Sequence, residues 1–220
     1  MKKRISQMSE YPSRNRDSQS GFSIVEMLIV ALVILVVVGI AVPNFMSFIH
    51  SSKLQGAGSD FTGLLQQARM RAVQSDDYYA TYFSLSGTLR EAYVDITKNG
   101  GTGAVSGDPL IEIANEIIPT AATSAPDTSD LQGKFLPAGS TLTVNDGASS
   151  TSPIIFNSRG LPCTSISASG GTICSSSSTY ATAYWVFFQD NVTRVWEGVT
   201  VSPAGRIQKW RHDGSSWTKM

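Results

Sequence analysis

The sequence is poor in charge, in cysteine and in histidine. Only 15% of its 220 residues are charged, its 17 basic and 17 acidic side chains cancel, and it has two cysteines and two histidines. Soluble domains commonly have about 25% charged residues, and a coiled coil or a polyelectrolyte has more. A net charge of zero argues against a nucleic-acid protein whose whole surface is basic. Aromatic residues make up 9% of the chain, too many for wholly disordered protein.

The sequence also lacks the motifs of several common chemistries. It has no Gly-x-Ser-x-Gly nucleophile elbow and no glycine-rich phosphate loop at a strand-to-helix junction. Two cysteines are too few to hold a metal alone, and His50 and His212 lie far from them in sequence. We expect both histidines to be solvated. The sequence therefore predicts no catalytic residues, no metal, no cofactor and no enzyme activity.

Charge differs sharply between the start of the chain and the remainder. Residues 1–21 have five basic and two acidic side chains, a net charge of +3, which leaves −3 for the rest. Residues 22–42 then form an apolar run of 21 residues with one charge, Glu26. As a helix at ~1.5 Å per residue, this run spans about 31 Å, enough to cross a hydrocarbon core of about 30 Å. Because basic flanks stay in the cytoplasm, we expect a single-pass membrane protein with an exported C-terminal domain.

Glu26 is the feature that a simple membrane span explains least. A carboxylate in a membrane helix costs roughly 2.5–3.5 kcal/mol and is normally paired or functional, yet residues 22–42 contain no basic residue. Cleavage between Gly21 and Phe22 would create an α-amino group four residues from Glu26, on the same face of a helix. Such an amine, from the same chain or a neighbour, would offset the desolvation of the carboxylate. A cleaved secretory signal ending near Ala41 and a plain single-span anchor remain as alternatives.

The segment Gly21-Phe22-Ser23-Ile24-Val25-Glu26, followed by an apolar helix, resembles the prepilin signal of type IV pilins and type II secretion pseudopilins. This resemblance implies that a prepilin peptidase cuts after Gly21 and methylates the new amine of Phe22. It implies that Glu26, the fifth mature residue, docks the subunit into a growing filament. Pro43 stands at the twenty-second mature position, where these proteins commonly have a proline, and we expect it to kink the helix because it lacks an N–H.

The resemblance also implies a location, a set of partners and a domain plan. The protein is expected in the bacterial inner membrane with its C-terminal domain in the periplasm, and later in a pilus or pseudopilus. Its expected partners are the prepilin peptidase, other pilins or pseudopilins, the inner-membrane assembly platform and, before assembly, the lipid bilayer. The plan is a leader at 1–21, a transmembrane helix at 22–42, an amphipathic helix at 43–75, and a β-rich domain with a basic tail at 76–220.

The remainder of the chain predicts an α+β fold, in which one long N-terminal helix packs on antiparallel sheet. Apolar residues recur at helical spacing from Phe61 to Ala72, so the helix is expected to reach about Gln74, loosened around Gly56 and Gly58. Stretches rich in β-branched and aromatic residues, bounded by turn residues, follow it. We expect strands at 78–85, 91–96, 110–118, 141–144, 154–157, 183–189, 193–201 and 206–211, and surface loops at 97–109, 119–133, 145–152 and 164–179.

Three further segments resemble the GspH/FimT-like minor pilins. They are the helix at 60–73, the strand and turn at 153–160, and the closing segment at 202–206. This resemblance implies a minor pilin at the tip or in the initiating complex of a type IV pilus. A minor pseudopilin of type II secretion is the close alternative, since the sequence does not separate the two. Residues 97–150 resemble no family segment.

Cys163 and Cys174 are eleven residues apart in a stretch rich in glycine and serine. In an exported domain the compartment is oxidising, so a disulfide is the expected state of this pair. Closing a loop of about twelve residues stabilises a fold by roughly 3 kcal/mol in the chain-entropy account.

The C-terminal tail offers a second functional hypothesis, DNA binding during natural transformation. Residues 194–220 carry a net charge of +3 and contain interleaved tryptophans; basic groups contact phosphates and an indole stacks on a base. The DNA-binding members of the FimT-like group have a Gly-Arg-x-Arg tail motif, whose second arginine is missing from Gly205-Arg206-Ile207-Gln208. The alternative is a solvated edge strand with protective charges. The candidate DNA-contacting residues are Arg206, Lys209, Trp210 and Arg211.

Overall fold

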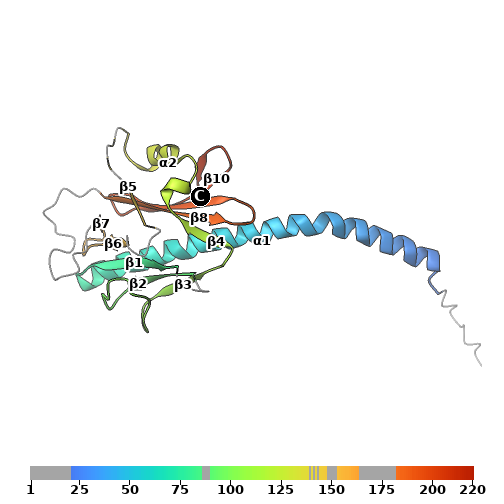
Figure 1. Cartoon of the computed structure of the whole chain (residues 1–220), viewed down its shortest axis with the longest axis horizontal. Coiled ribbons are helices and arrows are strands. Elements are labelled where there is room, and N and C mark those ends of the chain that lie inside the picture. Colours follow the sequence, from blue (N-terminus) through green and yellow to red (C-terminus); the bar gives the residue numbers. More distant parts are fainter. Residues whose placement is uncertain are drawn as a thin grey trace, which may run out of the picture. The chain divides into compact units, whose positions relative to one another are not determined.

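A computed structural model describes residues 21–85, 90–138, 140, 142, 144–147, 153–163 and 182–220. It confirms the α+β architecture, because one long N-terminal helix precedes two sheets that are almost entirely antiparallel (Figure 1). Helix α1 extends over Ile24–Ser75, close to its predicted end. The chain divides into two compact units, of which the first ends at Asn44 and the second begins at Phe45.

The second unit contains two β-sheets. The strands of sheet A are β1 (Tyr79–Ser84), β2 (Arg90–Asp95), β3 (Leu110–Ile113), β6 (Ile154–Phe156) and β7 (Pro162–Cys163). The strands of sheet B are β4 (Ile117–Thr120), β5 (Val144–Asp146), β8 (Ala183–Asp190), β9 (Trp196–Val201), β10 (Ile207–His212) and β11 (Trp217–Lys219). Sheet A has the order β3-β2-β1-β6-β7 and sheet B the order β11-β10-β9-β8-β4. Strand β5 pairs with the start of β8 in parallel, the exception among the described strand pairs.

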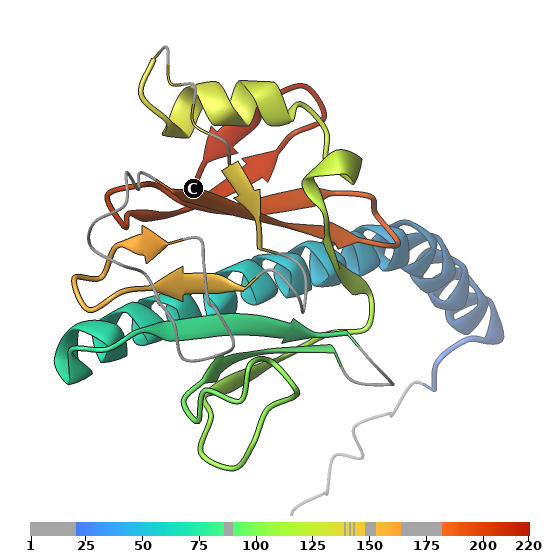
Figure 2. The same cartoon turned by 60° about the vertical axis from the view of Figure 1, so that its left-hand side comes forward.

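The main core lies where α1 packs against the inner faces of both sheets. In Figure 2 the cyan part of α1 runs along the green strands of sheet A and the red strands of sheet B. Phe61 shows why these three elements stay together: it is fully buried, and its ring lies 4.9 Å from that of Phe83 on β1 and 5.5 Å from that of Phe188 on β8. The other helical residues of this core are Leu54, Ala57, Leu64, Leu65, Ala68 and Ala72.

Each sheet is also covered on its outer face. Helix α2 (Thr128–Phe135) packs its Leu131 and Phe135 against the tryptophan-rich face of sheet B, and a single 3-10 turn (Ala122–Ser124) precedes it. Tyr82 and Tyr93 are buried on the outer face of sheet A. A Cβ added at Gly101 would lie 2.5 Å from the ring of Tyr82, so the loop after β2 lies directly on this face.

The structure corrects several expectations about the second unit. The predicted strand at 110–118 is two strands, β3 in sheet A and β4 in sheet B, because Ile117 donates its N–H to Ala114 in a turn between them. The predicted loop at 119–133 contains most of α2, and β7 and β11 lie in segments where we expected no strand. The loosening around Gly56 and Gly58 is also wrong, since α1 is helical throughout.

Candidate processing and assembly site

The junction between residues 21–23 and helix α1 is built around Ser23. Gly21, Phe22 and Ser23 are not helical, and α1 begins at Ile24. The hydroxyl of Ser23 accepts a hydrogen bond from the N–H of Val25 at 3.3 Å, and its carbonyl accepts one from Met27 at 3.1 Å. Serine is a preferred residue at a helix N-cap because its oxygen satisfies an unpaired N–H of the first turn. The Gly21–Phe22 bond therefore lies in exposed, non-helical backbone, which a protease can bind in an extended form.

Glu26 lies in the first turn of α1, just after this junction. A carboxylate is favourable there because the helix dipole places partial positive charge at the N-terminal end. The side chain is exposed, and no described residue forms an ion pair or a side-chain hydrogen bond with it. Because Phe22 precedes the helix, an amine at Phe22 is not fixed by helical geometry on the face of Glu26. This arrangement leaves the carboxylate available to a partner from another chain.

The part of α1 that lies in the first unit presents a continuous apolar surface that no other described residue covers. Its large apolar side chains, from Ile24 to Val42, are between 50% and 84% exposed. By length and composition α1 can cross a membrane. A continuous apolar surface of this kind needs lipid or other helices around it.

The comparison with family models decides the class of this site. Residues 16–42 of the 220 match the model described as the prokaryotic N-terminal methylation motif. The chain carries the signature of type IV pilins and pseudopilins. No match was found among the curated proteins or among the solved structures. The pilin signature indicates a structural protein of the class that prepilin peptidase processes, and the exposed apolar helix fits anchoring in a membrane and assembly with other pilins.

Pro43 lies inside α1, which continues through it as helix. Proline has no N–H to donate to the preceding turn. The side-chain amide of Asn44 donates a hydrogen bond to the carbonyl oxygen of Ile40 at 3.2 Å. A side chain thus gives one carbonyl of this turn a hydrogen-bond donor. The kink at Pro43 stays a prediction.

The structure places the four candidate DNA-contacting residues in different environments. Arg206 is exposed at the turn before β10. Lys209 lies 2.8 Å from the hydroxyl of Ser59 and 3.2 Å from the carboxylate of Glu197. Trp210 is 5% exposed, and its indole N–H donates to Thr200. The guanidinium of Arg211 donates to Ser51 at 3.0 Å, so three of the four residues bind other parts of the fold.

Cys163 is buried on β7, at the edge of sheet A. Cys174 lies outside the described residues, so the Cys163–Cys174 disulfide stays a prediction. In the described part of the chain, no three side chains of the histidine, cysteine, aspartate or glutamate type gather as a metal site.

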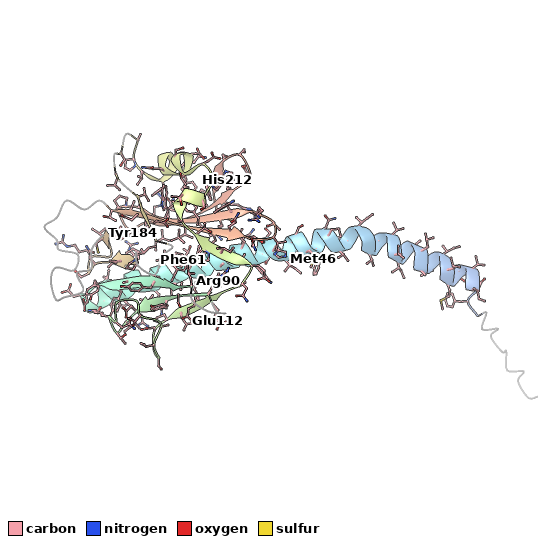
Figure 3. The ribbon with its side chains drawn as sticks, viewed as in Figure 1. Met46, Phe61, Arg90, Glu112, Tyr184 and His212 are labelled. Atoms are coloured by element: carbon pink, nitrogen blue, oxygen red, sulfur yellow. The ribbon has the colours of Figure 1, made fainter. Side chains whose placement is uncertain are left out.

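Sequence reasoning missed a series of polar contacts between distant segments, several of which join α1 to sheet B. His50 and His212 are not solvated as expected: His50 lies 3.1 Å from the buried carboxylate of Asp190, and His212 lies 3.0 Å from Asp127. Figure 3 labels His212 near the end of sheet B.

Glu197 on β9 is the most unusual of these groups, because it is fully buried beside Gly58 of α1. Burial raises the pKa of Glu197 above its usual value, and the nearby Lys209 opposes this rise. A single glutamate in a strand gives no sign in the sequence that it faces a helix. The glycine at position 58 was the one available signal, since glycine in a helix can mark a close approach.

Proposed function

We propose that this protein is a minor pilin that is made as a precursor, cut after Gly21 by prepilin peptidase, methylated at Phe22 and incorporated in a type IV pilus, at its tip or in its initiating complex. The observation that carries the proposal is Glu26, the one charged residue of the apolar segment 22–42, which lies in the first turn of α1 and has no partner among the described residues. The large apolar side chains around it are exposed. The cost of this carboxylate in lipid falls when it meets a positive charge, and cleavage creates such a charge at the end of each subunit.

The assembly step follows from this electrostatics. In the membrane, the apolar helix is solvated by lipid, with the domain after Pro43 on the periplasmic side. In the filament, the same helix packs against its neighbours, and Glu26 of one subunit lies near the amine of Phe22 of another. The pair is favourable because each charge offsets the desolvation of the other in a medium of low dielectric.

The experiment that tests this role compares Glu26→Ala with Met27→Ala in cells that hold the assembly system. Both variants should be cut after Gly21, because the cleavage site precedes the helix. Glu26→Ala should be absent from sheared filaments, whereas Met27→Ala, the neighbour that removes apolar surface but no charge, should be incorporated normally. Normal incorporation of Glu26→Ala would refute the docking role.

A type II secretion minor pseudopilin is the close alternative, because its processing and helix chemistry are the same. Deleting the gene separates the two: loss of surface pili supports the pilus, and retention of exoproteins in the periplasm supports the secretion system. DNA binding in natural transformation is a third reading. It is the weakest of the three, because Arg206 is exposed while Lys209, Trp210 and Arg211 bind other residues of the fold.

A further inference from the structure

Two glycine turns from different sheets meet beside Arg69 of α1. Gly160 follows β6 and Gly205 follows β9, and both have positive φ angles, 71° and 73°. A Cβ added at Gly205 would lie 2.5 Å from the carbonyl oxygen of Gly160, so the turns are in contact. A Cβ added at Gly160 would lie 3.0 Å from Nε of Arg69, and one at Gly205 would lie 3.3 Å from its Cζ. The guanidinium of Arg69 therefore lies across both turns.

Two more arginines flank the same point. Arg159 immediately precedes Gly160 and Arg206 immediately follows Gly205, and both are exposed. We call Arg69, Arg159 and Arg206 the arginine patch. No described carboxylate lies within ion-pair distance of any of the three. Three close cations without an anion repel one another, so the patch favours an anionic partner.

An apolar groove adjoins this patch on α1. It has a volume of about 410 Å³ and includes Arg69 in its lining. Its apolar lining comes from Met70 and Val73, which are 56% and 52% exposed, and Gln66 and Gln74 complete it. The groove lies near the C-terminal end of α1, whereas the apolar residues of the proposed membrane span lie at its N-terminal end. A surface that is complementary to both the groove and the arginine patch therefore needs an apolar side chain to fill the groove and a carboxylate beside it to pair with an arginine.

The free edge of sheet A offers this combination. Strand β3 is the edge strand, and its Glu112 lies directly opposite Glu91 of β2 (Figure 3 labels Glu112). Like charges directly opposite in a sheet repel, and no described cation pairs with either carboxylate. The neighbouring Arg90 donates instead to the carbonyls of Asn115 and Ile117.

Leu110 adds the apolar part of this surface. It is 46% exposed and lies two residues before Glu112 in the same strand, hence on the same face and about 7 Å away. We call Glu91, Leu110 and Glu112 the acidic edge. The acidic edge thus combines one apolar side chain with two unpaired carboxylates, as the groove and the arginine patch require.

We propose that the arginine patch of one copy docks on the acidic edge of a second copy of this chain. Leu110 enters the groove formed by Met70 and Val73, and guanidinium groups lie between Glu91 and Glu112. The two surfaces are different, so the contact is heterologous and joins two copies head to tail. The described groove lining contains no aromatic ring on which a base could stack, which favours a protein partner over a nucleic acid.

This inference rests on the proposed assembly into a filament and adds to it a contact between exported domains. It requires at least two adjacent copies. The two proposals can fail separately. If the contact between exported domains does not exist, a single copy can still enter the filament through Glu26, and the proposed function stands.

The test is photocrosslinking of the full-length chain in cells with its assembly system. A benzoylphenylalanine at Val73 should give a product of two chains, with the crosslink mapping to residues 110–113 of the second copy. Reversal of the patch (Arg159→Glu with Arg206→Glu) or of the edge (Glu91→Arg with Glu112→Arg) should lower the yield by about tenfold. The two reversals combined in one chain should restore it.

Arg194→Glu is the matched control, because Arg194 is exposed but belongs to neither surface; it should leave the yield unchanged. Limited proteolysis of each variant shows that the domain is folded. The proposal is overturned by a crosslink that survives both single reversals, by a loss that the combined chain does not restore, or by crosslinks to another protein alone. It is also overturned if the patch instead shifts DNA in a gel and the patch-reversed chain does not.

Discussion

Replacing Gly58 by alanine tests the closest approach of α1 to sheet B. A Cβ at this position would lie 2.5 Å from Oε1 and 2.8 Å from Cδ of Glu197. The carboxylate has little room to move, because Glu197 is fully buried and lies 3.2 Å from Nζ of Lys209. Gly63 is the matched control, since it lies in the same helix with no atom within 4 Å of an added Cβ.

The expected difference between the two variants follows from two opposing effects. Alanine is better than glycine in a helix interior by about 0.5–1 kcal/mol, and both variants gain this. Overpacking a filled site costs about 1–3 kcal/mol, and Gly58→Ala alone incurs this cost. Gly63→Ala should therefore be more stable than the parent chain, and Gly58→Ala should lie about 1–3 kcal/mol below Gly63→Ala.

Urea unfolding of the full-length chain in detergent micelles, followed by tryptophan fluorescence, measures both free energies. The structure also predicts a rescue: with Glu197→Val, which removes the carboxylate, Gly58→Ala should become stabilising like Gly63→Ala. Equal stabilisation by the two alanines in the parent chain would refute the close contact between Gly58 and Glu197. So would a penalty at Gly58 that Glu197→Val leaves unchanged.

Two further predictions concern pH and redox state. In the folded state, burial raises the pKa of the Glu197 carboxyl above its usual value of 4.5. The folded chain therefore holds the carboxyl proton more tightly than the unfolded chain, and the free energy of unfolding falls as the pH rises through the raised pKa. Glu197→Gln should flatten that part of the profile in thermal melts, and parallel profiles would contradict the burial of the charge. Cys174→Ser should lower the free energy of unfolding by about 3 kcal/mol. Two thiols that react with an alkylating reagent in the oxidised native protein would contradict the disulfide.

The parts of the fold that the sequence predicts are those in which one periodic pattern is uninterrupted. The apolar run at 22–42 and the stripe through Phe61 and Ala72 give helix α1 to within about a turn, because both patterns are local and have helical spacing. Strands such as β8 and β9 follow from their aromatic and β-branched residues. The proposed processing site is equally local, since Gly21, Phe22 and Glu26 are close in sequence and lie within the matched segment 16–42.

The features that the sequence does not predict depend on contacts between distant segments. The division of 110–118 between two sheets requires knowledge of which partner each half pairs with. Asp190 is buried beside His50, although the two residues are far apart in the sequence. Glu197 and Gly58 are likewise distant in sequence and adjacent in space. The arginine patch joins residues from α1 and from two turns, none of which is unusual alone. Pairing of this kind is set by tertiary packing rather than by propensity.

The central claim is that cleavage after Gly21 converts an uncompensated carboxylate in a lipid-facing helix into one half of an intersubunit charge pair. Mass spectrometry of the intact protein, purified from cells with an active prepilin peptidase, tests it most directly. We predict a mature chain that begins at Phe22 and carries one added methyl group on its amine. An uncut leader in those cells, or a mature chain that begins after Ala41, would contradict the account.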